Sequence, residues 1–220
     1  MVQDISNVLT PTNLAFLLKG LWLTLKLSFI IIILSTVIGT VLAVMRNSKT
    51  KVFKWIASIY IEFVRNVPNL LWIFTIFLVL QLKSTQAGIT SFTVFTSAAL
   101  AEIIRGGLNA IDHGQTEAGL SQGFTQLQIL QYIVLPQALR KMLPAMISQF
   151  VTVIKDTSLL YSVIALQELF GASQILMGRN FETTAVFTLY ITIAVIYFVI
   201  NFSISSFSRF LSRRWELARE

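Results

Sequence analysis

The chain has 220 residues, of which 55% are hydrophobic and only 12% are charged. A water-soluble domain carries about 25% charged residues, so this chain has too little polar surface to cover a globule in water, and we expect the lipid bilayer to be its solvent. The absence of cysteine excludes disulfides and thiolate chemistry, and a single histidine, His113, argues against a histidine metal site or catalytic triad. The net charge of +7 does not indicate nucleic-acid binding, because the basic residues lie in short connections beside apolar runs instead of on one basic face.

Five long apolar runs dominate the chain and predict its fold. A helix needs about 20 predominantly apolar residues to cross a bilayer, whereas a transmembrane strand needs only about 10, with alternating polarity. These runs are long and do not alternate, so the sequence predicts an all-α integral membrane protein with five transmembrane helices in a single domain covering residues 1–220. The predicted spans are residues 21–45, 55–82, 92–111, 143–169 and 184–207.

The basic residues between these runs predict the orientation of the chain in the membrane. The densest basic connection follows the first span and contains Arg46, Lys49, Lys51 and Lys54. The positive-inside rule places this connection in the cytoplasm. Five spans then place the N-terminus outside, and both the segment 112–141 and the arginine-rich C-terminal tail inside. Residues 1–11 hold the acidic Asp4 and no basic region, so we expect no cleaved signal peptide.

The polar segment 112–141 predicts two short helices separated by a turn. Thr125 and Gln128 fit a capping box at the start of the second helix. Gly123 suits the turn before that helix, and Pro136 is expected to end it. Apolar residues three or four positions apart form one helical face, which comprises Leu120, Phe124, Leu127, Leu130 and Val134.

The polar side chains of this segment favour a protein partner over the membrane surface. An amphipathic helix lying on anionic headgroups would carry Lys and Arg on its polar face. No basic residue occurs from Gly114 to Gln137. We therefore expect another protein to dock on this segment.

The spacing of seven residues in the same segment matches a known pattern. Glu117, Ala118 and Gly119 are followed by Gly123 and then by Ile133, Leu135 and Pro136. This order resembles the EAA loop of ABC-importer permeases, except that Gly119 replaces the second Ala. The resemblance implies a type I importer permease whose coupling loop enters a groove on a cytoplasmic ATPase; the coupling residues would be Glu117, Ala118, Gly119, Gly123, Leu135 and Pro136. By this resemblance Glu117 would pair with a basic residue of the ATPase, and Gly123 would permit the tight turn.

Four further segments are similar to those of permeases for polar amino acids. They are Glu62-x-x-Arg65-x-x-Pro68, Ala101-Glu102-x-x-Arg105-Gly106-Gly107, residues 135–140 and residues 155–159. The resemblance implies a multi-pass protein of the bacterial cytoplasmic membrane that works with an ATPase dimer, a second permease subunit, identical or related, and an extracytoplasmic amino-acid-binding protein. The chain has no Gly-x-x-x-x-Gly-Lys-Ser/Thr phosphate loop. ATP and magnesium would therefore bind to the partner ATPase, and we expect this chain to bind no cofactor or metal and to have no catalytic residues.

Ionisable residues inside predicted spans are candidates for the transport path, because each costs about 2.5 kcal/mol or more at the bilayer centre. Glu102, about ten residues into the third span, could bind a substrate ammonium, guanidinium or amide group. It could equally form an ion pair with Arg105, three residues later on the same helix. Glu62 and Arg65, also three residues apart, are expected to form a structural ion pair.

The fourth span is interrupted by three consecutive polar residues, Asp156, Thr157 and Ser158. Three such side chains cannot all face lipid, so we expect a broken or tilted helix here. Asp156 would then meet a substrate amine, and the two hydroxyls a carboxylate or amide; an interhelical hydrogen-bond cluster is the structural alternative. Thr75, two turns after Pro68, is a further candidate for the path.

Together these features predict a permease subunit of an ATP-driven importer for polar amino acids. The alternative is an ion-coupled secondary amino-acid transporter that uses Glu102 and Asp156 as proton or cation sites. The segment 112–141 favours the importer, since a secondary transporter has no ATPase to dock. A membrane-embedded enzyme is disfavoured, because the chain lacks cysteine and clustered catalytic groups.

Overall fold

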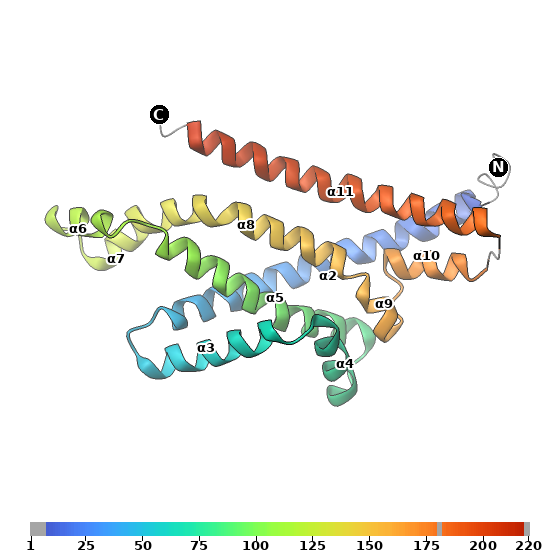
Figure 1. Cartoon of the computed structure of the whole chain (residues 1–220), viewed down its shortest axis with the longest axis horizontal. Helices are drawn as coiled ribbons and strands as arrows, with labels where there is room; N and C mark the ends of the chain where they lie inside the picture. The colour runs from blue at the N-terminus through green and yellow to red at the C-terminus, as the bar shows by residue number, and fades with distance from the viewer. Residues whose placement is uncertain (1–7, 180–181, 218–220) are drawn as a thin grey trace.

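The structure, a computed structural model, describes residues 8–179 and 182–217, and every regular element in these two segments is helical (Figure 1). The prediction of an all-α membrane protein is confirmed. Three helices are long and apolar enough to cross a bilayer: α2 (Pro11–Arg46), α5 (Ser84–Asn109) and α11 (Thr183–Leu217). Within the described residues the number of spans rises to as many as five if each of two bent helix pairs counts as one.

Helix α2 begins at Pro11, earlier than the predicted first span, because the preceding residues form a good helix start. The Thr10 hydroxyl accepts a hydrogen bond from the backbone N–H of Asn13 at 3.3 Å. Pro11 occupies the first turn of α2. Backbone N–H groups in that turn have no partner inside the helix, so the N–H that proline lacks costs no hydrogen bond. Further along, α2 packs closely on α5: a Cβ atom on Gly39 would lie 2.9 Å from the carbonyl oxygen of Ser97. Small residues at such crossings are typical of helices that pack within membranes.

The second predicted span, residues 55–82, is not one continuous helix. It is divided into α3 (Lys51–Asn66) and α4 (Asn69–Leu80), whose axes differ by 106°. Val67, the residue before Pro68, is extended with φ −103° and ψ 133°, as a residue before proline prefers. Figure 1 shows α4 turned sharply away from α3.

The helix that follows the Gly123 turn does not end at Pro136, so that prediction is wrong. The short α7 (Gln126–Gln128) passes into a π-helix, η1 (Ile129–Val134), and then into α8 (Leu135–Asp156) without a break. The backbone N–H of Leu135 donates to the carbonyl of Leu130, five residues earlier. This wider turn moves the carbonyl that would otherwise clash with the ring of Pro136.

The fourth predicted span, residues 143–169, also differs from the structure. The helical run begins well before it, at α7, and α8 ends at Asp156, inside the predicted range. A short α9 (Leu159–Ile164) continues it, and α10 (Leu169–Met177) follows after a 50° bend. The predicted interruption at Asp156 is present only as a two-residue turn, Thr157 and Ser158, in a helical run that continues to Ile164.

The long helices run side by side along the molecule and separate two distinct ends (Figure 1). The hairpin of α6 (His113–Ser121) and α7 lies at one end, together with the last turns of α11. The first turn of α2, α10 and the start of α11 lie at the other end. Three apolar clusters fill the interior between the helices, and their most buried members include Leu17 and Leu189, Ile31 and Phe92, and Ile61 and Leu100.

Candidate coupling surface and transport-path residues

The segment from α6 to α7 forms a compact helical hairpin, as predicted. The side chain of Asp112 accepts a hydrogen bond from the Gly114 N–H at 2.7 Å and caps the start of α6. Gly123 has φ +81° and makes the turn, a conformation that glycine adopts without strain. The Thr125 and Gln128 capping box is confirmed, since the Gln128 side chain accepts from the Thr125 N–H at 2.8 Å and the Thr125 hydroxyl from the Gln128 N–H at 3.4 Å.

Gly119, which departs from the family pattern, is buried where the hairpin closes. A Cβ atom at this position would lie 2.8 Å from Cγ1 of Ile129 and 3.1 Å from Cδ1 of Ile133. Its carbonyl also accepts a hydrogen bond from the Phe124 N–H at 3.1 Å. The large side chain of Ile129 thus occupies the space that an alanine methyl group would need.

The outer face of the hairpin is exposed and largely apolar. The exposed side chains of the predicted helical face are Leu120, Phe124, Leu127 and Leu130, and Tyr132 is also exposed. Leu127 is 62% exposed and Tyr132 is 69% exposed. Contiguous apolar surface of this kind marks a contact with another protein or with lipid. Glu117 and Ala118 are exposed in α6, and Leu135 and Pro136 are exposed at the start of α8.

The hairpin is joined to α8 through polar side chains. The side-chain amide of Gln137 donates to the side-chain oxygen of Gln115 at 3.2 Å and to the carbonyl of Ile133 at 2.9 Å. The helices η1 and α8 continue α7 without a break, so the hairpin and Asp156 belong to one helical run.

Glu102 lies in a cluster of three arginines from three helices. Its carboxylate is 2.6 Å from Arg46 of α2, 2.9 Å from Arg105 of α5 and 3.8 Å from Arg65 of α3, and its side chain is 17% exposed. The ion pair with Arg105 is therefore present. Since α5 begins at Ser84, Glu102 lies in the last third of that helix and not at its centre, as the predicted span had placed it.

Glu62 does not pair with Arg65, so that prediction is wrong. The Glu62 carboxylate instead lies 2.7 Å from Arg46, which bridges it to Glu102. Arg65 reaches Glu102 from the same helix as Glu62. Glu62 and Arg65 are three residues apart on one helix, and this spacing permits an ion pair. In the structure Arg46 of α2 contacts the carboxylates of both Glu62 and Glu102 instead.

Asp156 ends α8 at the break in the helix, and its carboxylate is half-buried. Among the described residues it makes no hydrogen bond or ion pair. The neighbouring hydroxyls are already satisfied, because Thr157 donates to the carbonyl of Ile154 and Ser158 to that of Lys155, each at 2.8 Å. The two hydroxyls have used their donors and can still accept, whereas the Asp156 carboxylate has no partner among the described residues.

A cavity of about 300 Å³ lies beside this break. Lys155, Ser158, Phe170, Tyr190 and Tyr197 line it, so it lies between the end of α8, α10 and α11. Thr75 is exposed on α4, does not line this cavity and forms no hydrogen bond in the described part of the chain.

A buried carboxylate that sequence reasoning missed joins three helices. Glu168 is fully buried and caps α10, accepting from the N–H groups of Phe170 at 2.9 Å and Gly171 at 2.8 Å. Its oxygens also accept from the hydroxyls of Thr24 in α2 at 3.2 Å and Tyr197 in α11 at 3.1 Å. The sequence did offer one signal for this residue, namely a carboxylate inside a predicted span. Because that span was predicted to run to residue 169, the start of a new helix at Leu169 was not recognised.

Comparison with known proteins gives the relationships of the chain. The family model described as "Binding-protein-dependent transport system inner membrane component" matches residues 35–217. The chain is 42% identical to the probable glutamine ABC transporter permease protein GlnP of Bacillus subtilis, with 96% of this chain and 99% of that protein covered. It is 35% identical to the glutamate/aspartate import permease protein GltK of Escherichia coli, with 92% and 94% covered.

A solved structure agrees with these relatives in sequence and in fold. The crystal structure of an amino acid ABC transporter with histidines contains a chain that is 33% identical and superposes with a TM-score of 0.83, covering 91% of this chain and 94% of that one. The MetNI methionine ABC transporter, at 21% identity and a TM-score of 0.73, shares the fold. Since the family model covers most of the chain, this protein belongs to the family of binding-protein-dependent transport system inner membrane components.

Proposed function

We propose that this chain is the transmembrane permease subunit of an ATP-driven importer that carries polar amino acids across the bacterial cytoplasmic membrane. The relatives are named as permeases for glutamine and for glutamate or aspartate, and the similar solved chain is that of an amino acid transporter. These names support both the transport class and the substrate class.

The exposed hairpin is the observation that carries this proposal. It presents Leu127 and the carboxylate of Glu117 at one end of the molecule and has no basic side chain from Gly114 to Gln137. Such a surface suits a groove on a cytoplasmic ATPase that supplies a basic partner for Glu117. The ATPase dimer would bind ATP and magnesium, and ATP binding would favour one transport state through contacts at this hairpin.

Two other partners and an orientation follow from the same proposal. Two permeases of Bacillus subtilis, GlnP and GlnM, resemble this chain at 42% and 35% identity, which supports a second permease subunit, identical or related, across the transport path. An extracytoplasmic binding protein would deliver the amino acid. The N-terminus would lie outside and the C-terminus inside, in keeping with the opposite ends occupied by the start of α2 and the end of α11.

Asp156 is the best candidate for contact with the substrate. Its carboxylate is free among the described residues and half-buried, and it lies at a helix break. An α-ammonium group would complement it, with Thr157 and Ser158 alongside. Glu102 is held by three arginines, so in this structure its proposed role is to join α2, α3 and α5.

Reconstitution of the chain in vesicles with its ATPase and binding protein tests the proposal. We expect uptake of labelled glutamine or glutamate that requires ATP on the ATPase side. Glu117→Lys should abolish association of the ATPase, whereas Glu182→Lys, a charge reversal at the opposite end of the molecule, should leave it intact. Uptake driven by a proton gradient without any ATPase would instead identify a secondary transporter.

A further inference from the structure

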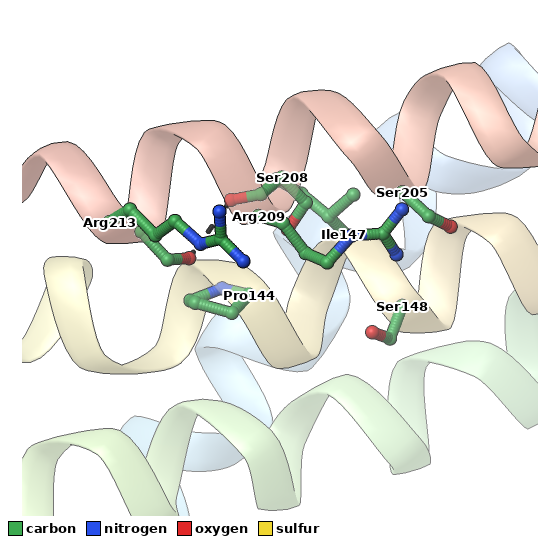
Figure 2. Close-up of a pocket in the computed structure, with 8 residues that line it drawn as sticks. Pro144, Ile147, Ser148, Ser205, Ser208, Arg209 and Arg213 are labelled. Atoms are coloured by element: carbon green, nitrogen blue, oxygen red, sulfur yellow. Dashed lines mark hydrogen bonds between the residues drawn. The ribbon is translucent and has the colours of Figure 1, made fainter.

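A pocket of about 340 Å³ between α8 and α11 carries an unassigned set of cationic and hydroxyl groups (Figure 2). Arg209 and Arg213 of α11 line it together with three serines of the same helix. Pro144, Ile147 and Ser148 of α8 form the opposite wall. Figure 2 shows both guanidinium groups lying in the space between the two helices.

Neither arginine is paired with a carboxylate among the described side chains. No ion pair of Arg209 or Arg213 occurs among residues 8–179 and 182–215. Arg209 donates to the hydroxyl of Ser206 at 2.8 Å and lies over the ring of Phe202 at 5.6 Å. Arg213 makes no hydrogen bond in the same part of the chain. This differs from the arginines around Glu102, each of which lies within 4.0 Å of a carboxylate oxygen.

Three serine hydroxyls of the pocket are also unused. A serine or threonine inside a helix commonly donates to the carbonyl four residues earlier, and in α11 Thr188, Thr192, Ser203 and Ser212 all do so. The hydroxyls of Ser148, Ser205 and Ser208 form no such bond within the described residues, although Ser208 is only 8% exposed. All three serines line the pocket, so their hydroxyls can donate hydrogen bonds to a group bound there.

The pocket lies at the depth of the inner headgroups when α11 spans the membrane. Arg209 and Arg213 follow the apolar run 184–207 by two and six residues, about 3 and 9 Å along a helix that rises 1.5 Å per residue. Phe207 and Phe210, which flank Arg209 in the sequence, are each at least 60% exposed. Aromatic side chains at both sides of a cation are typical of the boundary between hydrocarbon and headgroups.

From these observations we propose that the pocket binds the phosphate group of an anionic phospholipid of the cytoplasmic leaflet. Two guanidinium groups match the charge and the planar donor geometry that phosphate oxygens accept, and the free serine hydroxyls add neutral donors. Basic pockets between transmembrane helices on the cytoplasmic side are suited to such headgroups. The proposal concerns a lipid cofactor of the permease and does not depend on which substrate is transported.

Titration calorimetry on the full chain in a neutral maltoside detergent tests this site directly. The probes are dihexanoyl-phosphatidylglycerol, dihexanoyl-phosphatidylcholine and sodium phosphate, which separate an anionic lipid, a zwitterionic lipid and a free anion. We expect saturable binding of one phosphatidylglycerol per chain that weakens as salt is added, and no saturable binding of phosphatidylcholine. Sodium phosphate that binds as tightly as phosphatidylglycerol would overturn the lipid assignment.

Matched variants in α11 separate this pocket from general surface charge. The double variant Arg209→Gln/Arg213→Gln should weaken phosphatidylglycerol binding about tenfold or more, because charge-assisted hydrogen bonds are lost. Arg214→Gln removes one positive charge beside the pocket, where Arg214 lies over Phe210 at 5.9 Å, and should change the affinity less than about twofold. Equal losses in both variants would overturn the proposal.

A serine pair covers the case in which the arginine variant fails to fold. Ser208→Ala removes only a hydroxyl that has no partner among the described residues, so the fold should persist while the affinity falls several-fold. Ser203→Ala removes a hydroxyl bonded to the carbonyl of Val199, outside the pocket, and should have no effect on the affinity. Lipid binding in Ser208→Ala that is no weaker than in Ser203→Ala would overturn the site.

Discussion

Arg46 of α2 and Glu102 of α5 lie 2.6 Å apart although 56 residues separate them in the sequence. The same guanidinium reaches Glu62 of α3 at 2.7 Å. One arginine therefore ties together three helices near the end of α5, and Glu102 is the carboxylate to which three arginines converge. Loss of either partner would leave like charges close together with reduced access to water.

Glu102→Ala should destabilise the chain more than Glu62→Ala. Removing Glu102 leaves three arginines without their shared carboxylate, and breaking a largely buried ion pair costs about 3–5 kcal/mol, an upper bound for this partly exposed site. Glu62 is 60% exposed and has one partner, so its loss should cost less than about 1 kcal/mol. Thermal unfolding of the purified chain in detergent measures both, and equal shifts of the midpoint would contradict this account.

Glu168→Gln should destabilise the junction of α2, α10 and α11. One carboxylate oxygen accepts from Gly171 and the other from Phe170, so either orientation of the amide sets its NH₂ group against a backbone N–H. We expect a loss of about 1–3 kcal/mol of unfolding free energy. Tyr197→Phe removes one donor only and should cost about 1 kcal/mol or less. A Glu168→Gln variant no less stable than Tyr197→Phe would show that the carboxylate is dispensable.

Gly119→Ala should weaken the hairpin even though alanine is the usual residue of the family here. The added methyl group would press on Ile129 at 2.8 Å, and such overpacking costs about 1–3 kcal/mol. Gly106→Ala is the matched control, because a Cβ atom there meets nothing within 4 Å and alanine favours a helix by about 0.5–1 kcal/mol. Opposite shifts of the unfolding midpoint are expected, and co-purification of the ATPase should fall only for Gly119→Ala.

Asp156→Asn should reduce substrate-stimulated transport more than basal ATP turnover in the reconstituted complex. The amide keeps the shape of the side chain but removes the charge that would attract an ammonium group. Thr152→Ala, four residues earlier in α8, removes a hydroxyl bonded to the carbonyl of Ser148 and should leave both rates near those of the natural chain. An equal fall of transport and basal turnover in Asp156→Asn would assign the carboxylate a structural role.

The features that the sequence predicted well are those that depend on residues close together in the chain. The turn at Gly123 and the capping box of Thr125 and Gln128 depend on residues within about one helical turn of each other, so local chemistry suffices. The same holds for the all-helical fold, because the length and composition of each apolar run decide it. The break at Asp156 was also visible, since three polar side chains in a row cannot all face lipid.

At Pro68 and Pro136, rules based on the local sequence did not predict the geometry of the helix. The sequence predicts one span over residues 55–82, and the structure instead divides it beside Pro68 by a 106° bend. Pro136 was expected to end a helix, but a π-turn before it lets the helix continue. Proline permits a bend, a helix end or a continued helix, and its presence alone does not say which of these occurs.

Composition, charge and local motifs by themselves determined that this chain is a helical membrane protein with a non-basic helical hairpin, because the free energy of burying apolar runs and closing a tight turn depends on adjacent residues. Tertiary structure alone decided which charges meet. Arg46 takes both Glu62 and Glu102, and Glu168 accepts from Thr24, 144 residues earlier, and from Tyr197, 29 residues later. A charged side chain in an apolar environment is stabilised by the partner that the packing of the helices brings near. The number of residues between two side chains in the sequence does not give the distance between them in the fold.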